Sequence, residues 1–147
     1  MTRISVRLFW AGVAATVVMT AMMMFVAPMM GVHMDIAASL AGMMHMPWAA
    51  GLTAHMMFGV IVFPLVYAFV FANRLPGSPA VRGVIFGVVL WLMMEAVVMP
   101  MLGAGFFGMN GPSMMGAVAA LMAHLAYGAI LGFVAAGRTS AAELQVA

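Results

Sequence analysis

The chain has 147 residues, of which 67% are hydrophobic and only 5% are charged. Soluble domains carry about a quarter charged residues, so this composition excludes an ordinary water-soluble protein and indicates an integral membrane protein. The formal net charge of +2 comes without any basic and aromatic surface, which excludes a nucleic-acid partner and leaves the lipid bilayer as the expected surroundings. Cysteine is absent, which excludes disulfides, thiolate metal sites and a cysteine nucleophile.

The first apolar run covers about residues 8–28 and ends where Pro28 begins the sequence Pro-Met-Met-Gly. It is longer than the roughly 7–15 apolar residues of a signal peptide, so we expect an uncleaved membrane helix. Asp35 follows as the expected N-cap of a short helix from Ile36 to Met44. We expect this short helix to lie along the membrane interface.

Three further apolar runs have the length of a membrane span, at about residues 48–72, 81–101 and 114–136. Pro64 lies within the second run and is expected to kink it. In the third run, Gly83 and Gly87 are four positions apart, which favours close contact with another helix. Four spans and short loops use up the whole length, so we expect a single all-α domain, a four-transmembrane-helix bundle.

All five arginines fall at the N-terminus, between the second and third spans, or after the fourth span: Arg3, Arg7, Arg74, Arg82 and Arg138. With an even number of spans these three places share one side of the membrane. The positive-inside rule therefore predicts an inner-membrane protein with both termini in the cytoplasm.

Two-span units are predicted to be duplicated as tandem helical hairpins, with halves at about residues 1–74 and 75–138. The first and third spans both end in Pro-Met-x-Gly, and the second and fourth both carry His-x-x-x-Gly, beginning at His55 and His124. Parallel repeats place equivalent residues at similar depth, and alternate helices of an up-down bundle lie diagonally across its core. We therefore expect the two imidazoles to face each other.

Glu95 lies in the third span at nearly the same depth as the two histidines, counted at roughly 1.5 Å per residue from the outer helix ends. The sequence thus predicts an inward-facing cluster of His55, His124 and Glu95, in a setting where unpaired polar groups are costly. In one interpretation both imidazoles are axial ligands of haem b, and Gly59 and Gly128, one turn further on, leave room for a porphyrin edge.

Two other interpretations of the cluster stay open. The histidines could bind copper, zinc or iron directly, with Glu95 as an additional ligand. Alternatively, no ligand is bound, and the imidazoles serve helix packing within stripes of small residues.

Methionine is unusually frequent, with 21 residues in the chain. Most of these side chains are expected to fill the membrane core, because methionine is flexible and apolar. On the outer side, thioethers and imidazoles together suit Cu(I). They form a weaker candidate surface site that would feed the inner one: His33, Met34, Met44, His45 and Met46.

Hydrolytic chemistry has little support, because the sequence contains no His-Glu-x-x-His, no Gly-x-Ser-x-Gly elbow and no P-loop. An enzyme is not favoured. We expect a small membrane protein that binds haem b or a metal ion as an electron-transfer or metal-handling accessory. The alternative is a structural or assembly subunit of a membrane complex, or a homodimer, with no ligand.

The chain also resembles a family of small four-helix bacterial membrane proteins known only as a domain of unknown function. The resemblance covers almost the full length. It rests on these residues: Met34-Asp35, Leu40-Ala41-Gly42-Met43, Gly51, His55, Gly59, Leu75-Pro76-Gly77, Trp91, Met99-Pro100, Gly103-Ala104-Gly105-Phe106-Phe107-Gly108, His124, Tyr127, Gly128 and Gly132. It implies a four-helix fold and brings no established activity, so no catalytic role transfers.

Overall fold

The computed structural model of the chain describes residues 2–110 and 114–136, with side chains from Val6 onward. These residues form helices, turns and loops without any strand. Four of the helices are long and apolar enough to cross a membrane: Val6–Met29, Trp48–Phe71, Pro79–Met101 and Met115–Ala136. The predicted fold class is confirmed, and the chain is a multi-pass membrane protein.

Short π-helical segments, in which an N–H group bonds the carbonyl five residues back, interrupt three of the four spans. The first span consists of α1 (Thr2–Ala21), η1 (Met22–Val26) and α2 (Ala27–Met29). The second consists of α4 (Trp48–Met57), η2 (Phe58–Val62), α5 (Phe63–Val66) and η3 (Tyr67–Phe71). The third consists of α6 (Pro79–Met93), η4 (Met94–Val98) and α7 (Met99–Met101), and the fourth is the single helix α8 (Met115–Ala136). Two short helices lie outside the spans: α3 (Ile36–Met44) and the 3-10 turn η5 (Phe106–Gly108).

Prolines account for three of these π-helical segments, because η1, η2 and η4 each end two residues before Pro28, Pro64 or Pro100. A proline removes one helical N–H, and its ring clashes with the carbonyl of the preceding turn. Widening that turn keeps the span continuous where an ordinary helix would break. The π-helical segments of the first and third spans stand at the same distance from their prolines. This supports the predicted duplication, which stays a prediction.

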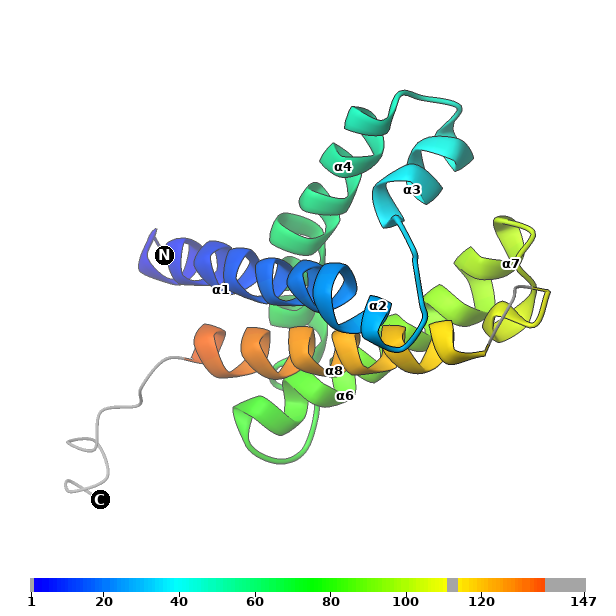
Figure 1. Cartoon of the computed structure of the whole chain (residues 1–147). Coiled ribbons are helices and arrows are strands. Elements are labelled where there is room, and N and C mark those ends of the chain that lie inside the picture. Colours follow the sequence, from blue (N-terminus) through cyan, green and yellow to red (C-terminus); the bar gives the residue numbers. More distant parts are fainter. Residues whose placement is uncertain (1, 111–113, 137–147) are drawn as a thin grey trace, which may run out of the picture.

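Helix α8 is the centre of the bundle, since half of its most apolar stretch is buried, against 22% for each of the first two spans. It packs against α1 on one side and α6 on the other, while the second span contacts α1 through η2 and α5 (Figure 1). The second and fourth spans are therefore diagonal neighbours, as the up-down topology predicts.

Glycines hold α6 and α8 together. A Cβ atom on Gly83 would overlap the carbonyl oxygen of Gly128, and a Cβ on Gly87 would overlap the carbonyl oxygen of His124. Only glycine allows the two backbones to approach so closely. The predicted helix contact at Gly83 and Gly87 is confirmed.

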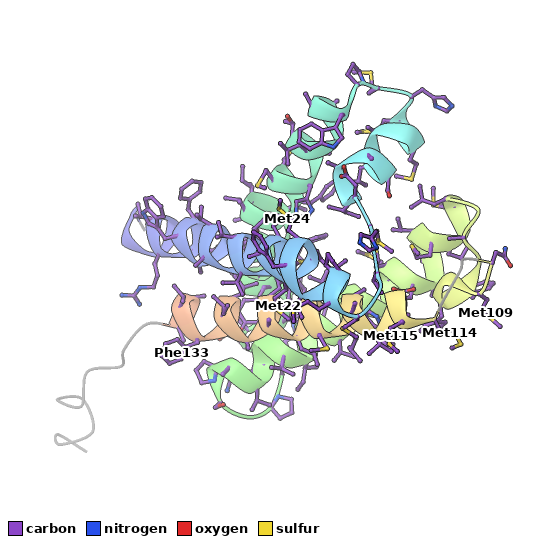
Figure 2. The ribbon with its side chains drawn as sticks, viewed as in Figure 1. Met22, Met24, Met109, Met114, Met115 and Phe133 are labelled. Carbon is purple, nitrogen blue, oxygen red and sulfur yellow. The ribbon has the colours of Figure 1, made fainter. Side chains whose placement is uncertain are left out.

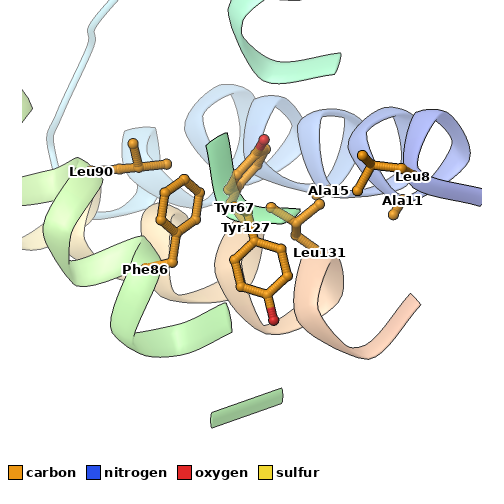
Figure 3. Close-up of a cluster of buried hydrophobic side chains, with 8 residues drawn as sticks. All are labelled: Leu8, Ala11, Ala15, Tyr67, Phe86, Leu90, Tyr127 and Leu131. Carbon is orange, nitrogen blue, oxygen red and sulfur yellow. The ribbon is translucent and has the colours of Figure 1, made fainter. Parts of the chain in front are cut away.

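Aromatic and aliphatic side chains fill the half of the bundle that the arginines predict to face the cytoplasm (Figure 3). The ring centroid of Phe86 lies 5.4 Å from that of Tyr67 and 5.0 Å from that of Phe71. Around these rings lies a buried cluster: Leu8, Ala11, Ala15, Tyr67, Phe86, Leu90, Tyr127 and Leu131. These buried contacts pack this half of the bundle closely.

The opposite half is more open, and it is called the outer half below because the arginines predict that it faces away from the cytoplasm. Helix α3 packs against α4, and the two lean together away from α1 and α8 (Figure 1). Asp35 caps α3 by accepting a hydrogen bond from the backbone N–H of Ala38, and its carboxylate also accepts one from the indole N–H of Trp48. The predicted N-cap and helix bounds are confirmed, whereas the interfacial position of α3 stays a prediction.

Large apolar side chains cover the outside of the spans, as a lipid-facing surface requires. Figure 2 shows Phe133 directed away from the bundle, and its side chain is 70% exposed. Several methionines are also exposed, among them Met29, Met57 and Met122. The methionines that face inward gather in the outer half.

Candidate metal site in the outer half

His55 on α4 and His124 on α8 line the same two adjoining cavities, with volumes of about 340 and 240 Å³. The two residues belong to diagonally placed spans, and His124 is only 7% exposed. The structure thus brings together the two histidines that the repeat singles out.

Hydrogen bonds orient both rings. Nδ1 of His124 donates to the carbonyl oxygen of Ala120 at 2.7 Å, which leaves Nε2 of the neutral ring with its lone pair and with no partner among the described residues. Metal-bound histidines usually donate their other N–H group to a carbonyl or carboxylate in this way. Nε2 of His55 lies 3.2 Å from the hydroxyl oxygen of Thr20 on α1.

Met19 on α1 and Met94 on η4 line both of the same cavities. Together with the two histidines, they give one side chain from each of the four spans. Neither methionine is predicted as a site residue from the sequence. With 21 methionines in the chain, no sequence signal distinguishes these two from the residues that meet lipid or fill the core.

Glu95 is only 1% exposed, and its Oε2 has no hydrogen-bond partner. It lines neither cavity, and no group of three or more histidine and acidic side chains that could hold a metal ion occurs in residues 2–110 and 114–136. The wide turn of η4 explains this placement: buried positions step from Leu90 to Glu95 and then to Met99, which leaves Met94 toward the cavities. The expected third ligand is therefore not grouped with the histidines.

The space beside Gly59 and Gly128 is already occupied. A Cβ atom on Gly59 would overlap the side chain of Thr16, and one on Gly128 would overlap the carbonyl oxygen of Gly83. Gly59 still borders the smaller cavity, but both glycines serve helix contacts. The room for a porphyrin edge beside these glycines stays a prediction.

An outer cleft of about 700 Å³ is lined by three of the predicted surface residues, His33, Met34 and His45. Met44 and Met46 are exposed and are not among the described residues that line it. The cleft leads inward, because its lining residues continue into the cavities: Met34 borders the larger, Met43 the smaller and Met94 both.

Comparison with known proteins identifies the family of this chain. The model of a family of unknown function, DUF6789, matches residues 3–146. The chain belongs to this family. No curated protein and no solved structure matches it.

Two polar groups complete the surroundings of the cavities in this DUF6789 protein. The hydroxyl of Thr16 borders the smaller cavity and is buried without a hydrogen-bond partner. The carboxylate of Asp35 borders the larger cavity on the outer side. The backbone N–H of Ala38 and the indole N–H of Trp48 hold the pKa of Asp35 below its ordinary value. An ionised carboxylate at this cavity favours a cation over an anion.

Proposed function

We propose that this protein is a metal-handling protein of the bacterial inner membrane, which binds a transition-metal ion between His55 and His124. One observation carries the proposal: two imidazoles from diagonal spans border the same cavities, and the Nδ1 of His124 is bonded to a backbone carbonyl while its Nε2 has no partner among the described residues. A neutral imidazole held in this way is a common metal ligand.

Haem b is the second candidate, supported by the same pair of opposed imidazoles. The packing favours a single ion instead, because Thr16 and the backbone of Gly83 fill the positions beside Gly59 and Gly128 where a porphyrin edge would enter. A purely structural role is supported by the hydrogen bonds that both rings make within the protein.

The arginines support an orientation with the cavities in the outer half. At one end of the bundle, the guanidinium groups of Arg7, Arg74 and Arg82 donate to the carbonyl oxygens of Ala136, Val70 and Ala72. The positive-inside rule assigns this end to the cytoplasm. The outer cleft would then open toward the periplasmic side, from which the ion would enter.

Elemental analysis and optical spectra of the protein purified in detergent test the proposal. We expect stoichiometric transition metal in the wild-type protein, lost in His55→Ala and in His124→Ala but retained in Thr53→Ala, an exposed change on the same helix as His55. A Soret band with a reduced α band after dithionite, lost in the same two histidine variants, would instead establish haem b. Protein free of both metal and haem, even after incubation with excess metal, would leave the structural role.

A further inference from the structure

We infer that the site is selective for Cu(I), with the thioethers of Met19 and Met94 completing a set of two imidazoles and two thioethers, one from each span. This inference rests on the proposed function, and it names the ion. The two methionines were not expected as ligands from the sequence. Their place beside both histidines in both cavities is the observation behind it.

Donor chemistry favours Cu(I) over the other candidate ions. Thioethers are soft ligands that suit Cu(I), whereas zinc and iron prefer imidazole with carboxylate or thiolate. The chain has no cysteine, and Glu95 lines neither cavity. The four proposed donors are therefore neutral nitrogen and sulfur atoms. The carboxylate of Asp35, which also borders the larger cavity, already accepts hydrogen bonds from Ala38 and Trp48.

Charge favours the same ion. All four proposed donors are neutral, and the carboxylate of Asp35, which borders the larger cavity, supplies a single negative charge. The Born cost of burial rises with the square of the charge, so a divalent ion costs about four times as much as a monovalent ion of the same size. A monovalent soft ion is the least costly occupant of this site.

The cavities also argue against these methionines as simple filler. Methionine is flexible and normally closes irregular gaps in a core. Here Met19 and Met94 border cavities of about 340 and 240 Å³ beside the two histidines. Met34 and Met43 continue the series of thioethers to the outer cleft, which gives a soft ion successive ligands along its route.

Titration calorimetry with Ag⁺, a redox-inert probe for Cu(I), and with Zn²⁺ tests the inference on detergent-purified protein. We compare the wild type with the double variant Met19→Leu/Met94→Leu, which nearly conserves side-chain volume. The matched control is Met57→Leu/Met122→Leu, whose methionines are exposed on spans and border neither cavity. Ag⁺ affinity should fall in the first double variant by at least the roughly tenfold that loss of an outer-shell partner costs, and stay unchanged in the control.

The outcomes separate the two claims. Unchanged Ag⁺ affinity in Met19→Leu/Met94→Leu, with metal still bound through the histidines, would overturn the inference and leave the proposed function. Wild-type protein that binds neither Ag⁺ nor Zn²⁺ would overturn both. X-ray absorption of the Cu(I)-loaded wild type adds a test that needs no variant. We expect nitrogen and sulfur scatterers together, and a shell of nitrogen or oxygen alone would contradict the thioether ligands.

Discussion

The hydroxyl of Tyr127 on α8 donates a hydrogen bond to the carbonyl oxygen of Gly59 on the diagonal span, at 2.7 Å. The wide turn of η2 makes this carbonyl available: the N–H of Phe63 bonds to Phe58, and Pro64 has no N–H to give. Tyr127 lies one turn from His124, and Gly59 lies one turn from His55. The bond therefore fixes the separation of the two histidine-bearing helices.

Replacing Tyr127 with phenylalanine should destabilise the bundle. The variant leaves the Gly59 carbonyl without a donor in an apolar interior. Removing such a partner costs about 1–3 kcal/mol in soluble proteins, and side-chain hydrogen bonds between membrane helices average about 0.6 kcal/mol. We expect a loss of roughly 0.6–2 kcal/mol, measured by equilibrium unfolding in mixed detergent micelles.

Tyr67→Phe is the matched control for Tyr127→Phe. The hydroxyl of Tyr67 reaches the carbonyl oxygen of Pro79 only at 3.4 Å, so its removal should cost clearly less. If both variants lose the same free energy of unfolding, the hydrogen bond of Tyr127 stabilises the protein no more than that of Tyr67.

Gly83→Ala should separate α6 from α8. The added methyl group would overlap the backbone of Gly128, and this contact cannot give way by a side-chain rotation. Overpacking of this kind costs about 1–3 kcal/mol. The unfolding midpoint of the purified protein should fall accordingly.

Gly42→Ala, by contrast with Gly83→Ala, should not destabilise the protein. A Cβ at Gly42 on α3 meets nothing within 4 Å, and alanine is the better helix former by about 1 kcal/mol. This variant should be as stable as the wild type or slightly more stable. A loss for Gly42→Ala as large as that for Gly83→Ala would contradict the assignment of the α6–α8 contact.

The helices of this fold can be predicted from local features of the sequence. Apolar length locates the four spans, the Asp35 cap locates α3, and the spacing of Gly83 and Gly87 locates a close helix contact. Each of these rests on local chemistry, which does not depend on how the helices are finally arranged. For that reason the helix bounds agree closely with expectation.

The candidate site was only partly predictable, because it depends on helix rotation. The histidine pair follows from the repeat, but which residue of the third span faces the cavities depends on the rotation of that helix. The structure places Met94 there and not Glu95. A depth count along an ideal helix contains no information about this rotation. Nor does it show that Thr16 fills the space beside Gly59.

The contact between Asp35 and Trp48 should depend on pH. Because the pKa of Asp35 is lowered in the folded protein by the Ala38 N–H and the Trp48 indole, the ionised carboxylate favours the folded α3–α4 hairpin. This contribution is present above the ordinary carboxyl pKa of about 3.9 and is lost as the pH falls through the lower folded value. Trp48 emission, recorded with Trp10 and Trp91 replaced by phenylalanine, should change in that acidic range.

Asp35→Asn is the control for the pH titration. An asparagine side chain still accepts the Ala38 hydrogen bond but does not titrate, so the acidic change in Trp48 emission should disappear. An unaltered change in this variant would assign the transition to another group.

The outer cleft should determine how fast the inner site fills. His33 and His45 line the cleft but neither inner cavity, so His33→Ala/His45→Ala should slow Ag⁺ uptake and leave the equilibrium affinity unchanged. Stopped-flow mixing with Ag⁺ followed by Trp emission measures the rate, and calorimetry measures the affinity. Met44→Leu/Met46→Leu is the matched control, because these exposed residues lie outside the cleft lining and should leave the rate unchanged. If His33→Ala/His45→Ala lowers the affinity for Ag⁺ but leaves the uptake rate unchanged, the two outer histidines belong to the binding site itself. If the wild type and both double variants take up Ag⁺ at the same rate, the ion enters by another route.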